Sequence, residues 1–286
     1  MSIFSDIRRA VTDAKERLVT YVETGSRIKS CACNELADGR CSAIGVAAAS
    51  LVVVALGFIT AIILNQLFIT GLQRGSVQIS AAEFSGASTV LQAIGFGIPV
   101  VLFAVLLDDV GVGKRLRNAS PAVMITGRIP SRSDIVTAGI GFLVMLGLLT
   151  LYQLGVQLFN AETATNSIVK TARRDPTLLL FLVPLSFLAI GTGEELLFRG
   201  ALQGSLTNLL GQHSGIIAAS VLFSVAHVPA LLGGGVPASL FILFLLGITL
   251  GYAYEYTNNL VVPILMHGAY NALLFATLYL RLTGAL

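Results

Sequence analysis

Apolar stretches about as long as a membrane is thick constrain what this chain can fold into. A helix needs about 20 predominantly apolar residues to cross the hydrocarbon core of a bilayer. Only 12% of the residues are charged, about half the share in an average soluble domain. We therefore expect an all-α, multi-pass transmembrane helix bundle of about seven to eight spans. The apolar stretches are 42–72, 86–107, 134–160, 177–210, 214–232, 236–257 and 260–281.

The region before the first span, residues 1–41, is polar and carries seven Lys/Arg. Its apolar residues between Ile3 and Val22 recur at helical spacing, which predicts an amphipathic helix on the membrane surface. A solvated helix packed on the rest of the protein is the alternative. The three cysteines, Cys31, Cys33 and Cys41, all lie here. Free thiols are the favoured interpretation, because three cysteines cannot all pair and are too few for a four-ligand zinc site; lipidation of Cys41 is the alternative.

The basic residues also predict how the chain is oriented. Lys and Arg concentrate in the cytoplasmic loops of membrane proteins. With seven in the N-terminal region and five in the loop 108–133, we expect a cytoplasmic N-terminus, in the cell membrane or, in a eukaryote, the endoplasmic reticulum. The loop 161–176 would then lie outside with three basic residues. Since the basic residues are spread over loops, we expect the bilayer as a partner and no nucleic acid.

Three formal charges lie within the seven residues Gly193–Arg199 (GEELLFR), shortly after the uncharged stretch Thr177–Ile190. A charge in hydrocarbon costs at least ~2.5–3.5 kcal/mol, so this cluster requires a reason. Glu195 and Arg199 are four residues apart with the carboxylate first, which favours an ion pair along a helix. Glu194 points about 100° away from Glu195. It is left as a spare carboxylate and is a candidate general base or acid.

The span that carries these charges is too long for a straight crossing. Residues 177–210 would form a helix of roughly 50 Å, whereas the hydrocarbon core is about 30 Å thick. The segment must tilt, bend at Pro184 or at the pair Gly191 and Gly193, or continue as a partly polar helix.

Further polar residues fall inside later spans. His227 lies near the end of the fifth span and His267 inside the seventh, while His213 lies at a glycine-rich turn and is interpreted as a polar loop residue. Helix rise places Glu194 and His227 at about the same depth, with His267 within about 8 Å of it. Asn271 shares a helix face with His267. Because ionisable groups in membranes face the bundle interior, we expect these side chains to converge. Each of them taken alone could instead form a structural hydrogen bond between helices.

Three motifs occur in order: Glu-Glu-x-x-x-Arg at 194–199, Phe-x-x-x-His at 223–227 and His-x-x-x-Asn at 267–271. Together they resemble the CPBP family, which comprises the CAAX prenyl endopeptidases and their prokaryotic relatives, also linked to bacteriocin self-immunity and called Abi. The resemblance covers roughly residues 177–282. It divides the chain into the polar region 1–41, three transmembrane helices within 42–160, and a catalytic helical core at 177–282.

The resemblance implies a role for each polar residue. Glu194 would activate the attacking water with help from His227, and His267 and Asn271 would stabilise the oxyanion of the tetrahedral intermediate. A carboxylate beside an imidazole can deprotonate a water, and donors on one helix face can be preorganised for a developing negative charge. The supporting residues would be Glu195, Arg199 and Phe223.

Zinc is the competing interpretation of the same residues. Glu194, His227 and His267 could supply three ligands and leave an open position. The chain has no His-Glu-x-x-His. If Glu194 were a zinc ligand, the general base would have to be Glu195, whose carboxylate is expected to pair with Arg199. A site without metal or cofactor is favoured.

The sequence therefore predicts a hydrolase: an intramembrane endopeptidase, similar to the CAAX prenyl proteases, that cuts a lipidated or membrane-anchored protein. One alternative is a transporter or proton-coupled permease that uses the same residues as a proton relay, although no inverted repeat is visible. The other alternative is a non-catalytic membrane scaffold or immunity protein that keeps the fold.

Overall fold

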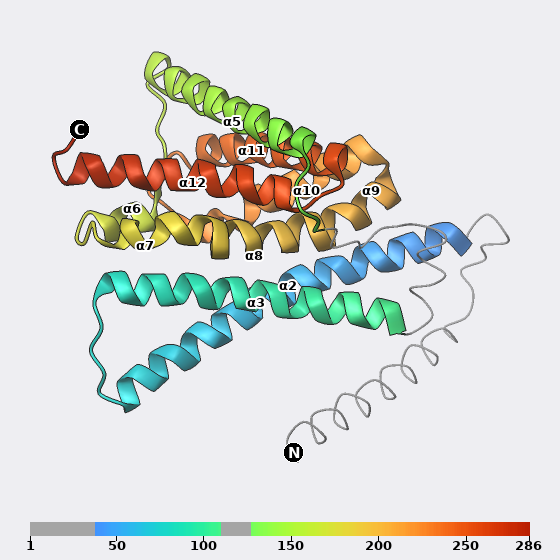
Figure 1. Ribbon diagram of the computed structural model, residues 1–286, viewed down its shortest axis with the longest axis horizontal. Helices are drawn as coiled ribbons and strands as arrows, with labels where there is room; N and C mark the ends of the chain where they lie inside the picture. The colour runs from blue at the N-terminus through green and yellow to red at the C-terminus, as the bar shows by residue number, and fades with distance from the viewer. Residues whose placement is uncertain (1–37, 110–126) are drawn as a thin grey trace.

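The structure is a computed structural model that describes residues 38–109 and 127–286. These residues form a bundle of long helices (Figure 1). Seven helical stretches among them are long and apolar enough to cross a membrane, which confirms the predicted all-α, multi-pass bundle. The amphipathic helix predicted for residues 1–41 lies outside the described residues, apart from 38–41, which begin the first helix.

The first two spans form a hairpin along one side of the bundle (Figure 1). They are α2 (Asp38–Arg74) and α3 (Ala81–Asp109). A Cβ added at Gly95 would lie only 2.5 Å from the Cα of Ala61, so the absent side chain is what allows the two helices to touch. Close backbone approach at small residues is how helices associate in membranes.

The third span, α5 (Arg132–Leu158), lies over α11 and α12 on the other side of the bundle (Figure 1). It begins with a capping box between Ser131 and Asp134. Arg128 binds the carboxylate of Asp134 and also donates to the carbonyl of Thr257, the last residue of α11. The start of α5 and the end of α11 therefore lie at the same face of the bundle.

The fourth span is one helical stretch, Leu178–Leu210, which alternates between α and π geometry. A π turn follows Pro184, whose ring removes one helical hydrogen bond. The hydroxyl of Ser186 donates to the carbonyl of Leu182 in α7, and the hydroxyl of Thr192 donates to the carbonyl of Phe187 in the turn. Its successive parts are α7 (Leu178–Leu185), η1 (Ser186–Gly191), α8 (Thr192–Glu195), η2 (Leu196–Gln203) and α9 (Gly204–Leu210).

The polar residues near the end of this span run inside the bundle: Gln203 and Ser205 are buried. Gln203 donates to the carbonyl of Gly251 and to the carboxylate of Glu255. Of the arrangements that the sequence left open, the structure therefore has the partly polar continuation, in which Gln203 bonds α11. The π turns were not predicted.

The last three spans are α10 (Gln212–Ala226), α11 (Val236–Thr257) and α12 (Val261–Leu282). A short helical turn, η3 (Val228–Ala230), follows α10. The interpretation of His213 as a loop residue is wrong. Gly211, with φ of 85°, is the single residue between α9 and α10. His213 therefore lies in the first turn of α10, and its Nδ1 atom lies 2.8 Å from the hydroxyl of Tyr252 on α11.

Short elements join the spans at one end of the bundle. The strand β1 (Thr165–Asn166) pairs antiparallel with β2 (Leu231–Leu232), and α6 (Ser167–Ala172) follows β1. These elements lie towards the same end as the C-terminus (Figure 1).

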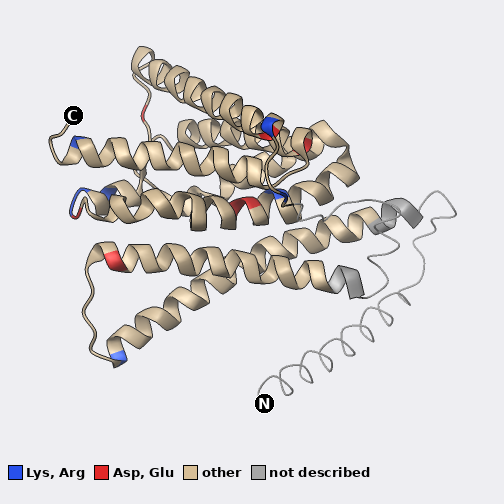
Figure 2. Ribbon diagram, viewed as in Figure 1, with Lys and Arg blue, Asp and Glu red and all other residues tan. Residues whose placement is uncertain are grey.

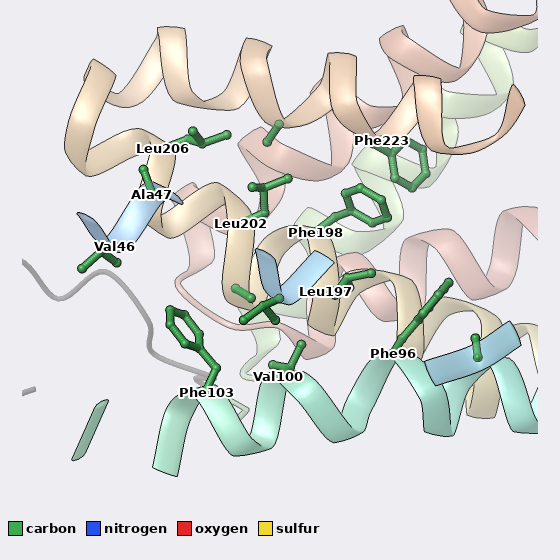
Figure 3. Close-up of a cluster of buried hydrophobic side chains, with 14 residues drawn as sticks. Val46, Ala47, Phe96, Val100, Phe103, Leu197, Phe198, Leu202, Leu206 and Phe223 are labelled. Carbon is green, nitrogen blue, oxygen red and sulfur yellow. The ribbon is translucent and has the colours of Figure 1, made fainter. Parts of the chain in front are cut away.

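A buried apolar cluster fixes the fourth span between the hairpin and α10. Phe96, Val100 and Phe103 of α3 lie below Leu197, Phe198 and Leu202, and Phe223 of α10 lies beside Phe198 (Figure 3). The rings of Phe198 and Phe223 meet edge to face at 5.2 Å between centroids. Most charged residues lie near the helix ends, whereas the acidic residues of α8 lie midway along the bundle (Figure 2).

Candidate active site

A cavity of about 790 Å³ opens beside α8, within the size range of ligand sites. Four residues that the sequence singled out line it. Glu194 comes from α8, His227 follows the last turn of α10, and His267 and Asn271 come from α12. The structure therefore brings together the four side chains that were expected to converge.

Glu194 is the only one of the two neighbouring glutamates that faces this cavity. Its Oε2 atom lies 3.6 Å from Nε2 of His227 and 3.9 Å from Nε2 of His267. That oxygen is buried and has no hydrogen-bond partner among the described residues. Both distances are too long for direct hydrogen bonds.

His227 is oriented by the backbone of its own helix. Its Nδ1 atom lies 2.8 Å from the carbonyl oxygen of Phe223. A carbonyl only accepts, so Nδ1 carries a proton, and Nε2, which faces Glu194, is the nitrogen that can accept one. The ring of Phe223 also packs on the His227 ring and under the guanidinium of Arg199.

His267 is oriented by a carboxylate instead. Its Nδ1 atom lies 2.8 Å from Oε1 of Glu195. The other oxygen of Glu195 lies 3.2 Å from Nε of Arg199, which confirms the predicted ion pair. Arg199 also donates to the carbonyl of Gly247 on α11 at 3.0 Å. Glu195 and Arg199 are both fully buried, so one chain of contacts runs from α11 through the fourth span to α12.

The contact between Glu195 and His267 was missed by the sequence reasoning, which assigned Glu195 to Arg199 alone. The two residues are 72 positions apart, and no local spacing links them. Asn271 lies one turn after His267 and is half-buried. Within the described residues no hydrogen bond engages its side chain, which leaves the amide free for a ligand.

One comparison with known proteins identifies this part of the chain. Residues 176–273 match the family model described as Rce1-like, type II CAAX prenyl endopeptidase Rce1-like. The chain carries an Rce1-like domain. This confirms the resemblance to the CPBP proteases, and at family level the domain is that of a CAAX-protease-like intramembrane endopeptidase. Neither the curated proteins nor the solved structures gave a match.

Helices outside the Rce1-like domain also line the cavity. Ser85, Ser88, Thr89 and Gln92 of α3 and Asn65 of α2 contribute polar side chains to it. The sequence reasoning missed them. The signal was present, because four polar residues at i, i+3, i+4 and i+7 mark one face of an otherwise apolar helix.

The zinc interpretation can be compared with the geometry. Within the described residues, no group of three or more His, Cys, Asp or Glu side chains is arranged to hold a metal ion. One nitrogen of His267 faces Glu195 and the other faces Glu194.

Proposed function

We propose that this protein is an endopeptidase that hydrolyses a peptide bond of a membrane-anchored or lipidated protein inside the cavity beside α8. One observation carries the proposal. A buried carboxylate oxygen of Glu194 has no hydrogen-bond partner among the described residues and lies 3.6 Å from Nε2 of His227 and 3.9 Å from Nε2 of His267. A water held there would lie next to two groups that can accept its proton.

In the proposed reaction, Glu194 and His227 take a proton from this water as its oxygen attacks the substrate carbonyl carbon. His227 suits this task because its lone pair at Nε2 faces Glu194. When the tetrahedral intermediate collapses, the C–N bond breaks and the same pair returns the proton to the leaving amine. Both steps are general acid–base catalysis by one pair of groups.

The oxyanion of the intermediate would be bound from α12. The side-chain amide of Asn271, which no described residue engages, would donate to it. His267 already donates Nδ1–H to Glu195, so donation from Nε2 requires a proton on both nitrogens. The resulting imidazolium would be balanced by the carboxylate of Glu195 at 2.8 Å. Donors fixed in advance around a developing negative charge are among the strongest catalytic effects.

The test is cleavage of a panel of lipidated and unlipidated peptides by the purified protein. Glu194→Gln keeps the size of the side chain and removes the base, so kcat should fall about 10²–10⁴-fold while the melting temperature stays the same. Glu162→Gln, at an exposed loop position, is the matched control and should cleave like the wild type. Full activity of a folded Glu194→Gln protein would overturn the proposal.

The same assay separates the metal-free reaction from a zinc reaction. We expect activity to survive prolonged treatment with a metal chelator, because Glu194 and His227 supply the base. Loss of activity that added zinc restores would show instead that Glu194, His227 and His267 act as ligands.

A further inference from the structure

The segment that joins α5 to α7 lines part of the cavity. We call residues 165–172 of this segment, which form β1 and α6, the strap. Asn166, Ile168 and Thr171 of the strap line the cavity together with His227 and Ala230. The strap therefore borders the same space as the candidate base.

The catalytic side chains are almost covered by the protein. Only 12% of the side-chain surface of Glu194 is exposed, and only 7% of that of His267. The proposed substrate is part of a longer polypeptide, so at least one end of the bound segment has to leave the cavity. An extended chain is about 5 Å wide at its backbone alone. One part of the cavity wall must therefore move aside when a substrate enters.

One end of the strap is firmly held. Ala172, the last residue of α6, is fully buried. It belongs to the same buried apolar cluster as Leu178 and Leu182 of α7. Because close packing fixes this end on the fourth span, the end of α6 is suited to be a hinge.

The other end of the strap is held by few contacts. β1 pairs with β2 through two residue pairs, and the outer pair, Thr165 with Leu232, is exposed. Just before β1, the N–H of Ala164 donates to the hydroxyl of Ser239 on α11 at 3.0 Å. Two-stranded ladders are marginally stable by themselves, and elements held by a few exposed hydrogen bonds open locally at a low cost in free energy. Of the two ends, β1 is therefore the one that can detach.

β2 is linked to the candidate base by one short turn. η3 joins His227 directly to β2. Within it, the N–H of Ala230 donates to the carbonyl of His227 at 2.9 Å. Pairing of β1 with β2 therefore also holds the turn that carries His227.

We propose that the strap is a lid over the cavity. It separates from β2 and turns about the end of α6 to admit a substrate polypeptide, and it closes again over the bound segment. Closure restores the β1–β2 pairing next to His227 and excludes bulk water from the site. This inference rests on the proposed peptidase function and adds the step by which the substrate enters.

The first experiment locks the lid with a disulfide. Thr165→Cys and Leu232→Cys are introduced together into a protein whose Cys31, Cys33 and Cys41 are replaced by Ser. The two positions are direct cross-strand partners, and the Cβ atoms of such partners are about 4.5–5.5 Å apart, close to the separation that a disulfide requires. Cleavage of the peptide panel should fall at least about 10-fold on oxidation and return on reduction, because the cross-link prevents the strands from separating. Full cleavage by protein that mass spectrometry shows to be cross-linked would overturn the lid.

A second experiment is independent of catalysis. A lipidated peptide of the panel, labelled with a fluorophore, is mixed with the Glu194→Gln form of the double-cysteine protein, and anisotropy is followed over time. Oxidation before mixing should slow association at least about 10-fold, and oxidation after mixing should slow dissociation by a similar factor, because both steps need the open lid. Faster dissociation after oxidation would show that the cross-link merely distorts the site, and would overturn the lid.

The two experiments separate this inference from the proposed function. If the wild type cleaved no peptide of the panel, the peptidase function would fail, while slow association and dissociation in the cross-linked protein would still establish the lid. If cross-linking left both rates unchanged and the wild type cleaved, the lid would fail and the peptidase function would stand.

Discussion

The two histidines of the site are held by different partners, and this difference assigns them different tasks. The carbonyl of Phe223 accepts from His227 and leaves its Nε2 lone pair for the water. The carboxylate of Glu195 accepts from His267 and can balance a positive ring. In the proposed reaction one imidazole is therefore a base and the other an oxyanion donor, because environment sets the role of a titratable group.

The buried ion pair allows stability and activity to be separated by mutation. Arg199→Met leaves the carboxylate of Glu195 buried without its cation, so the free energy of unfolding should fall by about 3–5 kcal/mol. The double variant Glu195→Gln with Arg199→Met removes both charges and should recover much of that loss. Its kcat should remain low, because His267 loses its balancing carboxylate.

The measurements are unfolding in detergent and kcat on the peptide panel. Arg281→Met, near the exposed end of α12, is the control and should resemble the wild type in both. A double variant with wild-type kcat would show that Glu195 has no part in positioning His267.

At the scale of elements, the fourth span decides which way each charged side chain points. The π turns on both sides of α8 place Glu194 towards the cavity, while Glu195 and Arg199 point into the bundle. π turns are uncommon and frequently occur at functional sites. The contact between Gly193 and Ala93 then sets how close α3 comes to the base.

Gly193→Ala tests this close approach. The added methyl group would meet the backbone of Ala93 at 2.9 Å, so α3 must move away, at a cost of about 1–3 kcal/mol. Peptidase activity should also fall when α3 moves, because α3 forms one wall of the cavity. The matched control is Gly97→Ala in α3, where no atom lies within 4 Å of the new Cβ. There the free energy of unfolding should stay the same or rise slightly. Equal effects of the two substitutions would contradict the packing argument.

At the scale of the whole molecule, the cavity is offset towards one face. Residues of α6 line it, and α6 lies towards the end of the bundle that holds the C-terminus (Figure 1). Seven spans place the residues before the first span and those after the last on opposite sides of a membrane. With a cytoplasmic N-terminus, as the basic residues predict, the cavity would open towards the non-cytoplasmic face.

Cysteine labelling in sealed vesicles tests this orientation. The starting protein has Cys31, Cys33 and Cys41 replaced by Ser. In intact right-side-out vesicles, a membrane-impermeant maleimide should label Ala161→Cys at once, and Gly127→Cys only after permeabilisation. Both positions are exposed. The reverse pattern would place the cavity on the cytoplasmic side and the N-terminus outside.

The sequence by itself determined the spans and the local pairs. The stretch 42–72 became the span Ala43–Arg74, because hydropathy is a local property and the bilayer sets the length. The pair Glu195–Arg199 followed from helical spacing alone. The spacing of the polar residues of α3 also indicated a polar helix face. It did not indicate which part of the molecule that face contacts.

Only the tertiary structure decided which nitrogen of each histidine is engaged and which residue engages it. It also decided that the fourth span contains π turns and that Ser88 and Gln92 of α3 line the same cavity as Glu194. These features depend on how each helix is rotated and how closely it approaches its neighbours. Close contacts such as the one at Gly193 set that rotation and approach between residues far apart in the chain, and no local pattern encodes them.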